Sequence, residues 1–230
     1  MAVILNIETS EKTCSTALTA DGMVITFREE LAERNHAVSL SQQISDCMAE
    51  ARRLGLKLEA VAVSMGPGSY TGLRIGLSEA KGLAYALKVP LIGVDTLQLL
   101  SVQAMFGPEA DDEALFAPMV DARRMDVFTG VYDWALNPVI EPGAVILEPD
   151  TWAELLASHK IMIFGSGSDK AATVLPAENV QHIQGITPHA VHMLALAERA
   201  WRNGDFIDVA YSTPNYLKDF QASTPKKPIF

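Results

Sequence analysis

The chain has 230 residues, 49% of them hydrophobic, so it can bury a substantial core as one large or two small domains. Its formal net charge of −10 argues against a free-standing nucleic-acid binder, because neutralising phosphates requires clustered Lys and Arg. Cys14 and Cys47 have no CxxC spacing, the apolar start lacks the basic residues of a signal peptide, and no apolar run reaches membrane-spanning length. We therefore expect a cytoplasmic protein with buried, reduced thiols.

The first half of the chain has the alternating patterns of an α/β fold. Three strands come first, the second and third joined by the turn signal Asp21-Gly22, which gives an antiparallel opening. A long helix, a buried strand, a second helix, a short strand and a third helix follow. The predicted elements span 3–8, 13–19, 23–28, 36–54, 60–65, 71–87, 91–94 and 96–105.

The polar, acidic and turn-rich segment 107–113 is the best candidate boundary, dividing the chain into an N-terminal lobe, 1–106, and a C-terminal lobe, 107–230. After this segment the order of elements seen in the first half repeats: three strands, a helix, a strand, a Gly-rich turn and a helix. This repeat predicts two related α/β lobes. We expect the proline-containing tail to be extended and able to pack back on the first lobe. The predicted elements span 115–121, 126–132, 144–147, 151–158, 161–164, 165–168 and 188–201.

The most informative stretch is the Gly-rich joint 66–76, Gly-Pro-Gly-Ser-Tyr-Thr-Gly-Leu-Arg-Ile-Gly, between a buried strand and a helix. Such a joint points backbone N–H groups and a helix N-terminus at one place, where an anion or a partner chain can lie. It lacks the Gly-Lys-Ser/Thr of a P-loop, and Thr71 occupies the third-glycine position of a dinucleotide fingerprint. A tight strand-to-helix turn is the third interpretation.

The helix that follows the joint has small residues at every fourth position: Gly72, Gly76, Ala80 and Ala84. A stripe of small side chains lets another helix approach closely. We interpret it as a partner-binding face, and packing against the chain's own sheet is the alternative.

An acid ends the first strand of each half, Glu8 in one and Asp121 in the other. Two carboxylates facing each other across a cleft would suit Mg-phosphate chemistry, whereas turn formation and surface charge are the alternative. None of the five histidines forms a paired helical metal motif, and no Gly-x-Ser-x-Gly elbow is present, so no catalytic residue or metal ligand is predicted. The candidate residues of a degenerate nucleotide site are Glu8, Thr9, Ser10, Asp121, Gly165 and Gly167.

The joint 66–76 and Ile7-Glu8-Thr9-Ser10 together resemble the TsaB (YeaZ) family, and the stretches 90–97, 120–128 and 214–217 fit it as well. The resemblance covers nearly the whole chain. It implies two ribonuclease-H-like lobes of the actin/Hsp70/sugar-kinase (ASKHA) type and a role in making threonylcarbamoyladenosine (t6A) in tRNA. In that system a paralogous subunit, TsaD, holds the metal and transfers the threonylcarbamoyl group, and a small ATPase, TsaE, joins it.

By this resemblance the chain is a non-catalytic subunit that pairs with TsaD, or with itself when alone, through helices of the first lobe. The resemblance implies no intrinsic cofactor, ATP or ADP at the complex interface, contact with tRNA through the complex, and no membrane. The catalytic paralogue has two histidines four residues apart on its first long helix. Here the residue four positions after His36 is Leu40. The predicted partner-binding residues are His36, Leu40, Ile44, Met48, Gly68, Tyr70, Thr71, Gly72, Arg74, Ile75, Gly76 and Ala80.

Two other functions stay open. An ATP-dependent phosphotransferase of the same fold would place Glu8, Asp121 and the two Gly-rich turns around a nucleotide, and titration with Mg-ATP would reveal it. A homodimeric scaffold with another partner would be revealed by a pull-down.

Overall fold

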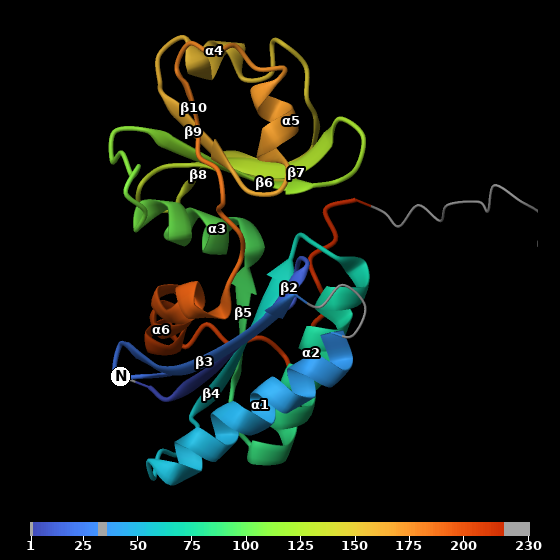
Figure 1. Cartoon of the computed structure of the whole chain (residues 1–230), viewed down its shortest axis with the longest axis vertical. Helices are drawn as coiled ribbons and strands as arrows, with labels where there is room; N and C mark the ends of the chain where they lie inside the picture. The colour runs from blue at the N-terminus through green and yellow to red at the C-terminus, as the bar shows by residue number, and fades with distance from the viewer. Residues whose placement is uncertain (1, 32–35, 219–230) are drawn as a thin grey trace, which may run out of the picture.

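The first lobe is built on a five-stranded mixed sheet. In the computed structural model, which describes residues 2–31 and 36–218 and only the backbone of His36, the chain forms two such sheets (Figure 1). The first has the order β3-β2-β1-β4-β5, in which β1, β2 and β3 are antiparallel and β1, β4 and β5 are parallel. Its strands are β1 (Ile4–Glu8), β2 (Thr13–Ala20), β3 (Met23–Leu31), β4 (Ala60–Gly66) and β5 (Leu91–Asp95).

The second sheet repeats this plan in the order β8-β7-β6-β9-β10, which confirms the predicted pair of related lobes. Its strand β8 is longer than the predicted strand 144–147. Pro138 and Pro142 argued against a strand at these positions, because proline has no N–H to donate to a neighbouring strand. The structure accommodates them because β8 is an edge strand, where the missing N–H can face solvent. The three-residue β10 was not predicted. The strands are β6 (Leu115–Asp121), β7 (Asp126–Tyr132), β8 (Pro138–Ile146), β9 (Ile161–Phe164) and β10 (Val180–His182).

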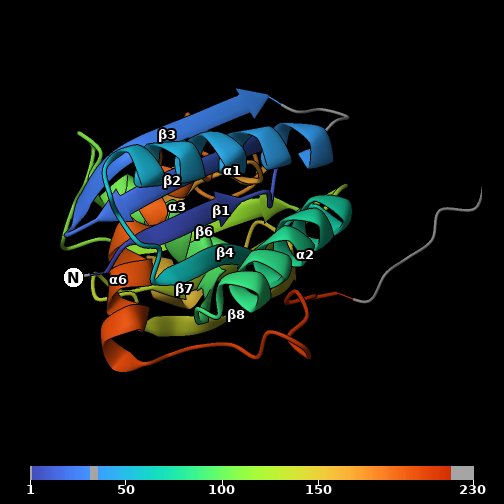
Figure 2. The same ribbon diagram turned by 90° about the horizontal axis from the view of Figure 1, so that it is seen from below.

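Helices α1 (His36–Arg53) and α2 (Tyr70–Leu87) cover one face of the first sheet and lie side by side (Figure 2). Their apolar side chains pack with those of the strands into one core, which includes Leu40 and Leu77. Burial of one such leucine contributes roughly 1.5–3 kcal/mol, which fixes the face that each helix turns inward. The predicted buried thiols, Cys14 and Cys47, lie in or against this core and are not disulfide-bonded.

Helix α3 (Thr96–Met105) lies between the two lobes (Figure 1). Leu99 and Val102 pack into the core beneath the first sheet, whereas Leu97 and Leu100 pack into the core of the second. Because both faces of α3 are buried, its sequence is apolar all round rather than striped. Asp95 caps its start by accepting hydrogen bonds from the N–H groups of the helix's first turn.

The chain returns to the first lobe near its end. The short helices α4 (Ala153–Leu156) and α5 (Ser168–Ala172) cover the second sheet, but the 3₁₀ helix η1 (Ala190–Met193) and α6 (Leu194–Asn203) pack beneath the first. Residues 190–203 thus pack on the first lobe although they follow the predicted boundary at 107–113. An amphipathic pattern such as that of 188–201 shows that a helix covers a sheet, but not which sheet it covers.

Candidate functional site

The Gly-rich joint between β4 and α2 packs against the turn that follows β1. Gly66 has a φ of +105°, a conformation that favours glycine, and its Cβ position would lie 3.0 Å from the carbonyl oxygen of Asn215. The Ser69 N–H donates to the Ser10 carbonyl at 2.6 Å, and the Gly72 N–H donates to the Ser69 hydroxyl at 3.2 Å. Two N–H groups that a phosphate cradle would offer are therefore already used inside the lobe.

The stripe of small residues on α2 faces inward, which favours the alternative for Gly72, Gly76 and Ala80, packing within the chain's own lobe. A Cβ at Gly72 would overlap the Thr9 carbonyl oxygen, and a Cβ at Gly76 would overlap Thr9 Oγ1. Ala80 lies in the core. The small residues do allow a close approach, but what approaches is Thr9, in the chain's own turn after β1. A four-residue period cannot distinguish these two partners.

The predicted partner-binding residues of α1 also divide by burial. Leu40 and Ile44 are buried in the core and Met48 packs against it, so the first two have little surface available to a partner. The side chain of His36 lies outside the described residues. Gly68 is partly buried against Ser10. What α1 presents outward near α2 includes Ala37 and Ser41, whose hydroxyl donates to Glu79 on α2 at 3.2 Å.

The outward face of α2 brings the remaining predicted residues together. Tyr70, Thr71 and Arg74 are exposed and Ile75 is half-buried. They line a shallow groove between the two helices, whose lining residues are Ala37, Tyr70, Thr71, Arg74, Ile75, Ser78 and Glu79. This groove is an open, mainly apolar surface with charged groups at its edge, which is typical of a protein-binding surface rather than of an enclosed ligand site.

Arg74 is held between two tyrosines at one end of this groove. Its guanidinium carbon lies 4.1 Å from the ring centre of Tyr70 and 5.9 Å from that of Tyr216, and its Nε donates to the Tyr216 hydroxyl at 2.9 Å. Tyr216 comes from the C-terminal segment and was not among the predicted site residues. The stretch 214–217 contributed to the family resemblance, but nothing in the sequence placed it next to α2.

The acid at the end of β1 is sealed inside the first lobe. Glu8 is buried, and its Oε1 accepts a hydrogen bond from the Ser10 N–H at 2.5 Å, whereas its Oε2 has no hydrogen-bond partner in the described part of the chain. Burial raises the pKa of Glu8 from 4.5 to about 7. Thr9 and Ser10 are buried as well, and Thr9 Oγ1 donates to the Gly72 carbonyl at 2.8 Å. These three residues therefore hold the Gly-rich joint in place.

The corresponding acid of the second lobe lies in a different environment. Asp121 is exposed at the end of β6 and forms an ion pair with Lys170 at 2.7 Å. Gly165 and Gly167 pack tightly on that strand and its neighbour, since their Cβ positions would lie 2.5 Å from the Met119 oxygen and 2.8 Å from Val127 Cγ1. Both glycines thus serve the local packing of the turn after β9.

The two lobes are bridged at this point. The Ser166 hydroxyl donates to the Glu11 carboxylate of the first lobe and accepts a hydrogen bond from the Asp121 N–H at 3.1 Å. Glu8 is enclosed in the first lobe, whereas Asp121 is paired with Lys170 at the surface of the second. No cluster of three or more His, Cys, Asp and Glu residues suited to a metal ion occurs within residues 2–31 and 36–218. Over the same residues, no helix has the length and apolarity to cross a membrane.

Comparison with known proteins gives concordant matches. The family model of TsaD, tRNA N6-adenosine threonylcarbamoyltransferase, matches residues 25–226. The tRNA threonylcarbamoyladenosine biosynthesis protein TsaB of Bacillus subtilis is 30% identical, with 94% of this chain and 93% of that protein covered. The TsaB protein of Escherichia coli is 29% identical, with 94% of each chain covered.

Solved structures agree with these matches. YeaZ from Pseudomonas aeruginosa superposes with a TM-score of 0.76 and 26% identity, over 94% of this chain and 100% of that one. A ROK family transcriptional regulator, homologous to the E. coli MLC protein, shares the fold alone, with a TM-score of 0.50 and 10% identity over 88% of this chain and 79% of its own. The ASKHA fold predicted for the two lobes is confirmed.

Proposed function

The chain belongs to the TsaB family of t6A biosynthesis proteins, which is related to TsaD, and from this premise we propose that it is a non-catalytic subunit on which TsaD depends. In this role it forms a heterodimer with TsaD, and TsaD carries out the transfer of the threonylcarbamoyl group to tRNA. The same surface pairs two copies of this chain when TsaD is absent.

The observation that carries the non-catalytic role is the enclosure of Glu8. A carboxylate that holds a hydrated metal ion must be ionised, and the ion must be able to reach it. Glu8 is buried beneath the β1–β2 turn and the Gly-rich joint, and its pKa is raised by burial to about 7. The same enclosure counts against the phosphotransferase alternative. We expect calorimetric titration with Mg-ATP to give neither tight binding nor turnover.

The relation to TsaD supports the choice of partner. A family model built on TsaD matches most of this chain, including α1 and α2, so the partner has corresponding helices. Two related lobes can pair about a pseudo-twofold axis and bury the matching faces of α1 and α2 in a four-helix interface. Tyr and Arg are the residue types that dominate binding energy at protein interfaces, and Tyr70 and Arg74 lie at the groove between these helices.

The other components follow from the same premise. A net charge of −10 favours tRNA contact through the complex rather than through this chain alone. TsaE joins the pair, with ATP or ADP at the complex interface, and we place this activity in the cytoplasm.

A reconstituted reaction tests the proposal. Purified TsaD, TsaE, the enzyme that makes the threonylcarbamoyl adenylate, threonine, bicarbonate, Mg-ATP and unmodified tRNA are combined with or without this chain. The t6A formed is measured by mass spectrometry of digested tRNA. We expect t6A only when this chain is present. Equal t6A formation without it would exclude the proposed role.

A further inference from the structure

After α6, residues 205–218 run back along the first lobe (red in Figure 1). We call this segment the strap, because hydrogen bonds hold it to the lobe along its length. The Ile207 N–H donates to the Leu91 carbonyl of β5 at 2.8 Å, and the Asn215 N–H donates to the Met65 carbonyl of β4 at 2.7 Å. Between these points, Lys81 of α2 donates to two strap carbonyls, those of Ala210 and Ser212. The strap is thus tied to both strands and to α2.

The strap delivers Tyr216 to the groove end of α2. The rings of Tyr216 and Tyr70 have centroids 5.2 Å apart and are tilted by 32°, and the Tyr216 hydroxyl accepts the hydrogen bond from Arg74. Beyond it, Lys218 forms an ion pair with Asp126 of the second lobe. Tyr216 is therefore anchored on both sides, by the Asn215–Met65 hydrogen bond and by this ion pair.

This arrangement contributes little to the core. Tyr216 is 42% exposed and Tyr70 36% exposed, and Arg74 is also exposed, so each of the three keeps a large part of its surface available to a partner. Instead they form a preorganised outward surface, continuous with the groove between α1 and α2. Side chains that are fixed before binding lose less conformational entropy when a partner docks.

We propose that Tyr216 is a positioning residue of the docking surface for TsaD: the strap holds its ring and hydroxyl so that Arg74 and Tyr70 are fixed in the orientation that the partner's helices meet. This inference rests on the proposed function. The occupant is the TsaD helix pair because the Tyr70–Arg74–Tyr216 cluster adjoins the α1–α2 groove assigned to it.

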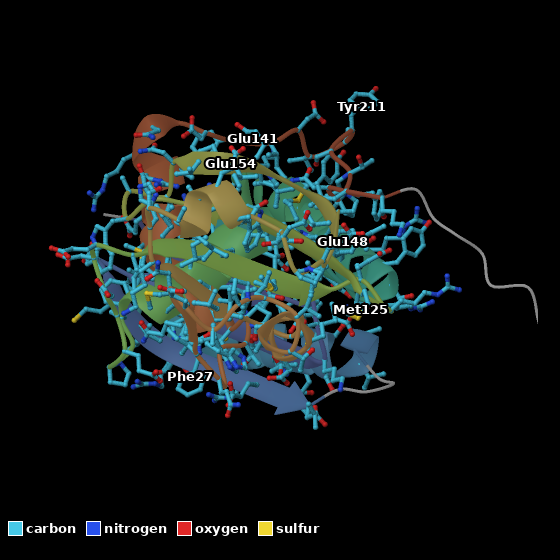
Figure 3. The ribbon with its side chains drawn as sticks, turned by 90° about the horizontal axis from the view of Figure 1, so that it is seen from above. Phe27, Met125, Glu141, Glu148, Glu154 and Tyr211 are labelled. Carbon is cyan, nitrogen blue, oxygen red and sulfur yellow. The ribbon has the colours of Figure 1, made fainter. Side chains whose placement is uncertain are left out.

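The test measures the affinity of the full chain for purified TsaD by calorimetry or biolayer interferometry. We expect Tyr216→Ala to weaken binding about tenfold or more, as a hot-spot change does, and Tyr216→Phe, which keeps the ring but loses the hydroxyl, to weaken it about two- to threefold. The matched control is Tyr211→Ala, on the same strap, whose side chain is 86% exposed and projects outward (Figure 3). It should leave the affinity unchanged.

A double-mutant cycle with Arg74→Ala separates positioning from a general structural role. If Tyr216 acts through Arg74, its replacement should cost much less affinity in the Arg74→Ala background than in the unaltered chain. Equal losses in both backgrounds, an unchanged affinity for Tyr216→Ala, or an equal loss for Tyr211→Ala would overturn the inference. Thermal unfolding checks that each variant is folded, and Tyr216→Phe carries the test if the alanine variant is not.

The two proposals fail in different ways. If the unaltered chain does not bind TsaD, both fall. If the unaltered chain binds and Tyr216→Ala binds equally well, only the role of Tyr216 falls.

Discussion

At the scale of single residues, the same carboxylate can serve as a ligand or as a structural group, and burial decides which. Glu8 ends β1 at a position where an open site would hold phosphate or metal, yet its Oε1 accepts a hydrogen bond from the Ser10 N–H of the adjacent turn. Its raised pKa is the consequence of losing water without gaining a cation. The sequence placed Glu8 at the strand end correctly, but it contained no sign that the Gly-rich joint would cover it.

Glu8 should make folding stability pH-dependent. Its pKa is about 7 in the folded chain and 4.5 ordinarily, so the folded state binds more protons between these values and stability falls as pH rises through this window. The loss amounts to about 3 kcal/mol when fully developed. We expect Glu8→Gln to remove this loss. The free energy of unfolding of the variant, relative to that of the unaltered chain, should therefore rise from pH 5 to pH 8.

Urea unfolding at several pH values measures this difference. The exposed Glu148, labelled in Figure 3, provides the control Glu148→Gln, which should follow the unaltered chain at every pH. A Glu8→Gln curve parallel to that of the unaltered chain would show that Glu8 does not titrate in this window.

At the scale of elements, α2 shows what periodicity can and cannot reveal. The start and end of the helix and its small-residue stripe were predicted from sequence, as were most strands of both lobes. The direction of the stripe was not, because a small-residue face suits a partner helix and the chain's own turn after β1 equally well. The position of Tyr216 could not be predicted from sequence either, because the strap is separated from α2 along the chain by the whole second lobe.

Two glycines of α2 should therefore respond oppositely to alanine. Gly76→Ala should cost about 2 kcal/mol or more, because its Cβ would overlap Thr9 Oγ1, which is held by its bond to the Gly72 carbonyl. Gly82→Ala should stabilise by about 0.5–1 kcal/mol, because this exposed helical position has no described atom within 4 Å of its Cβ. Chemical denaturation compares the two, and similar effects at both sites would contradict the inward direction of the stripe.

At the scale of the whole molecule, two lobes of one fold are joined by contacts that cross between them. The Glu11–Ser166 hydrogen bond and the Lys218–Asp126 ion pair both cross between the lobes, and α3 packs on both sheets. The outer face of α1 and α2 stays open (Figure 2). We propose that the chain supports a catalytic relative through this face and leaves the chemistry to that relative.

The measurement that tests this account most directly is a titration of t6A formation. A fixed amount of TsaD, with the other components in excess, receives increasing amounts of this chain, of Glu8→Gln or of Arg74→Glu. The account predicts a rate that rises from near zero and saturates at one chain per TsaD, the same plateau for Glu8→Gln, and a requirement for much more of Arg74→Glu. A full rate without the chain, or a plateau abolished by Glu8→Gln in a folded variant, would contradict it.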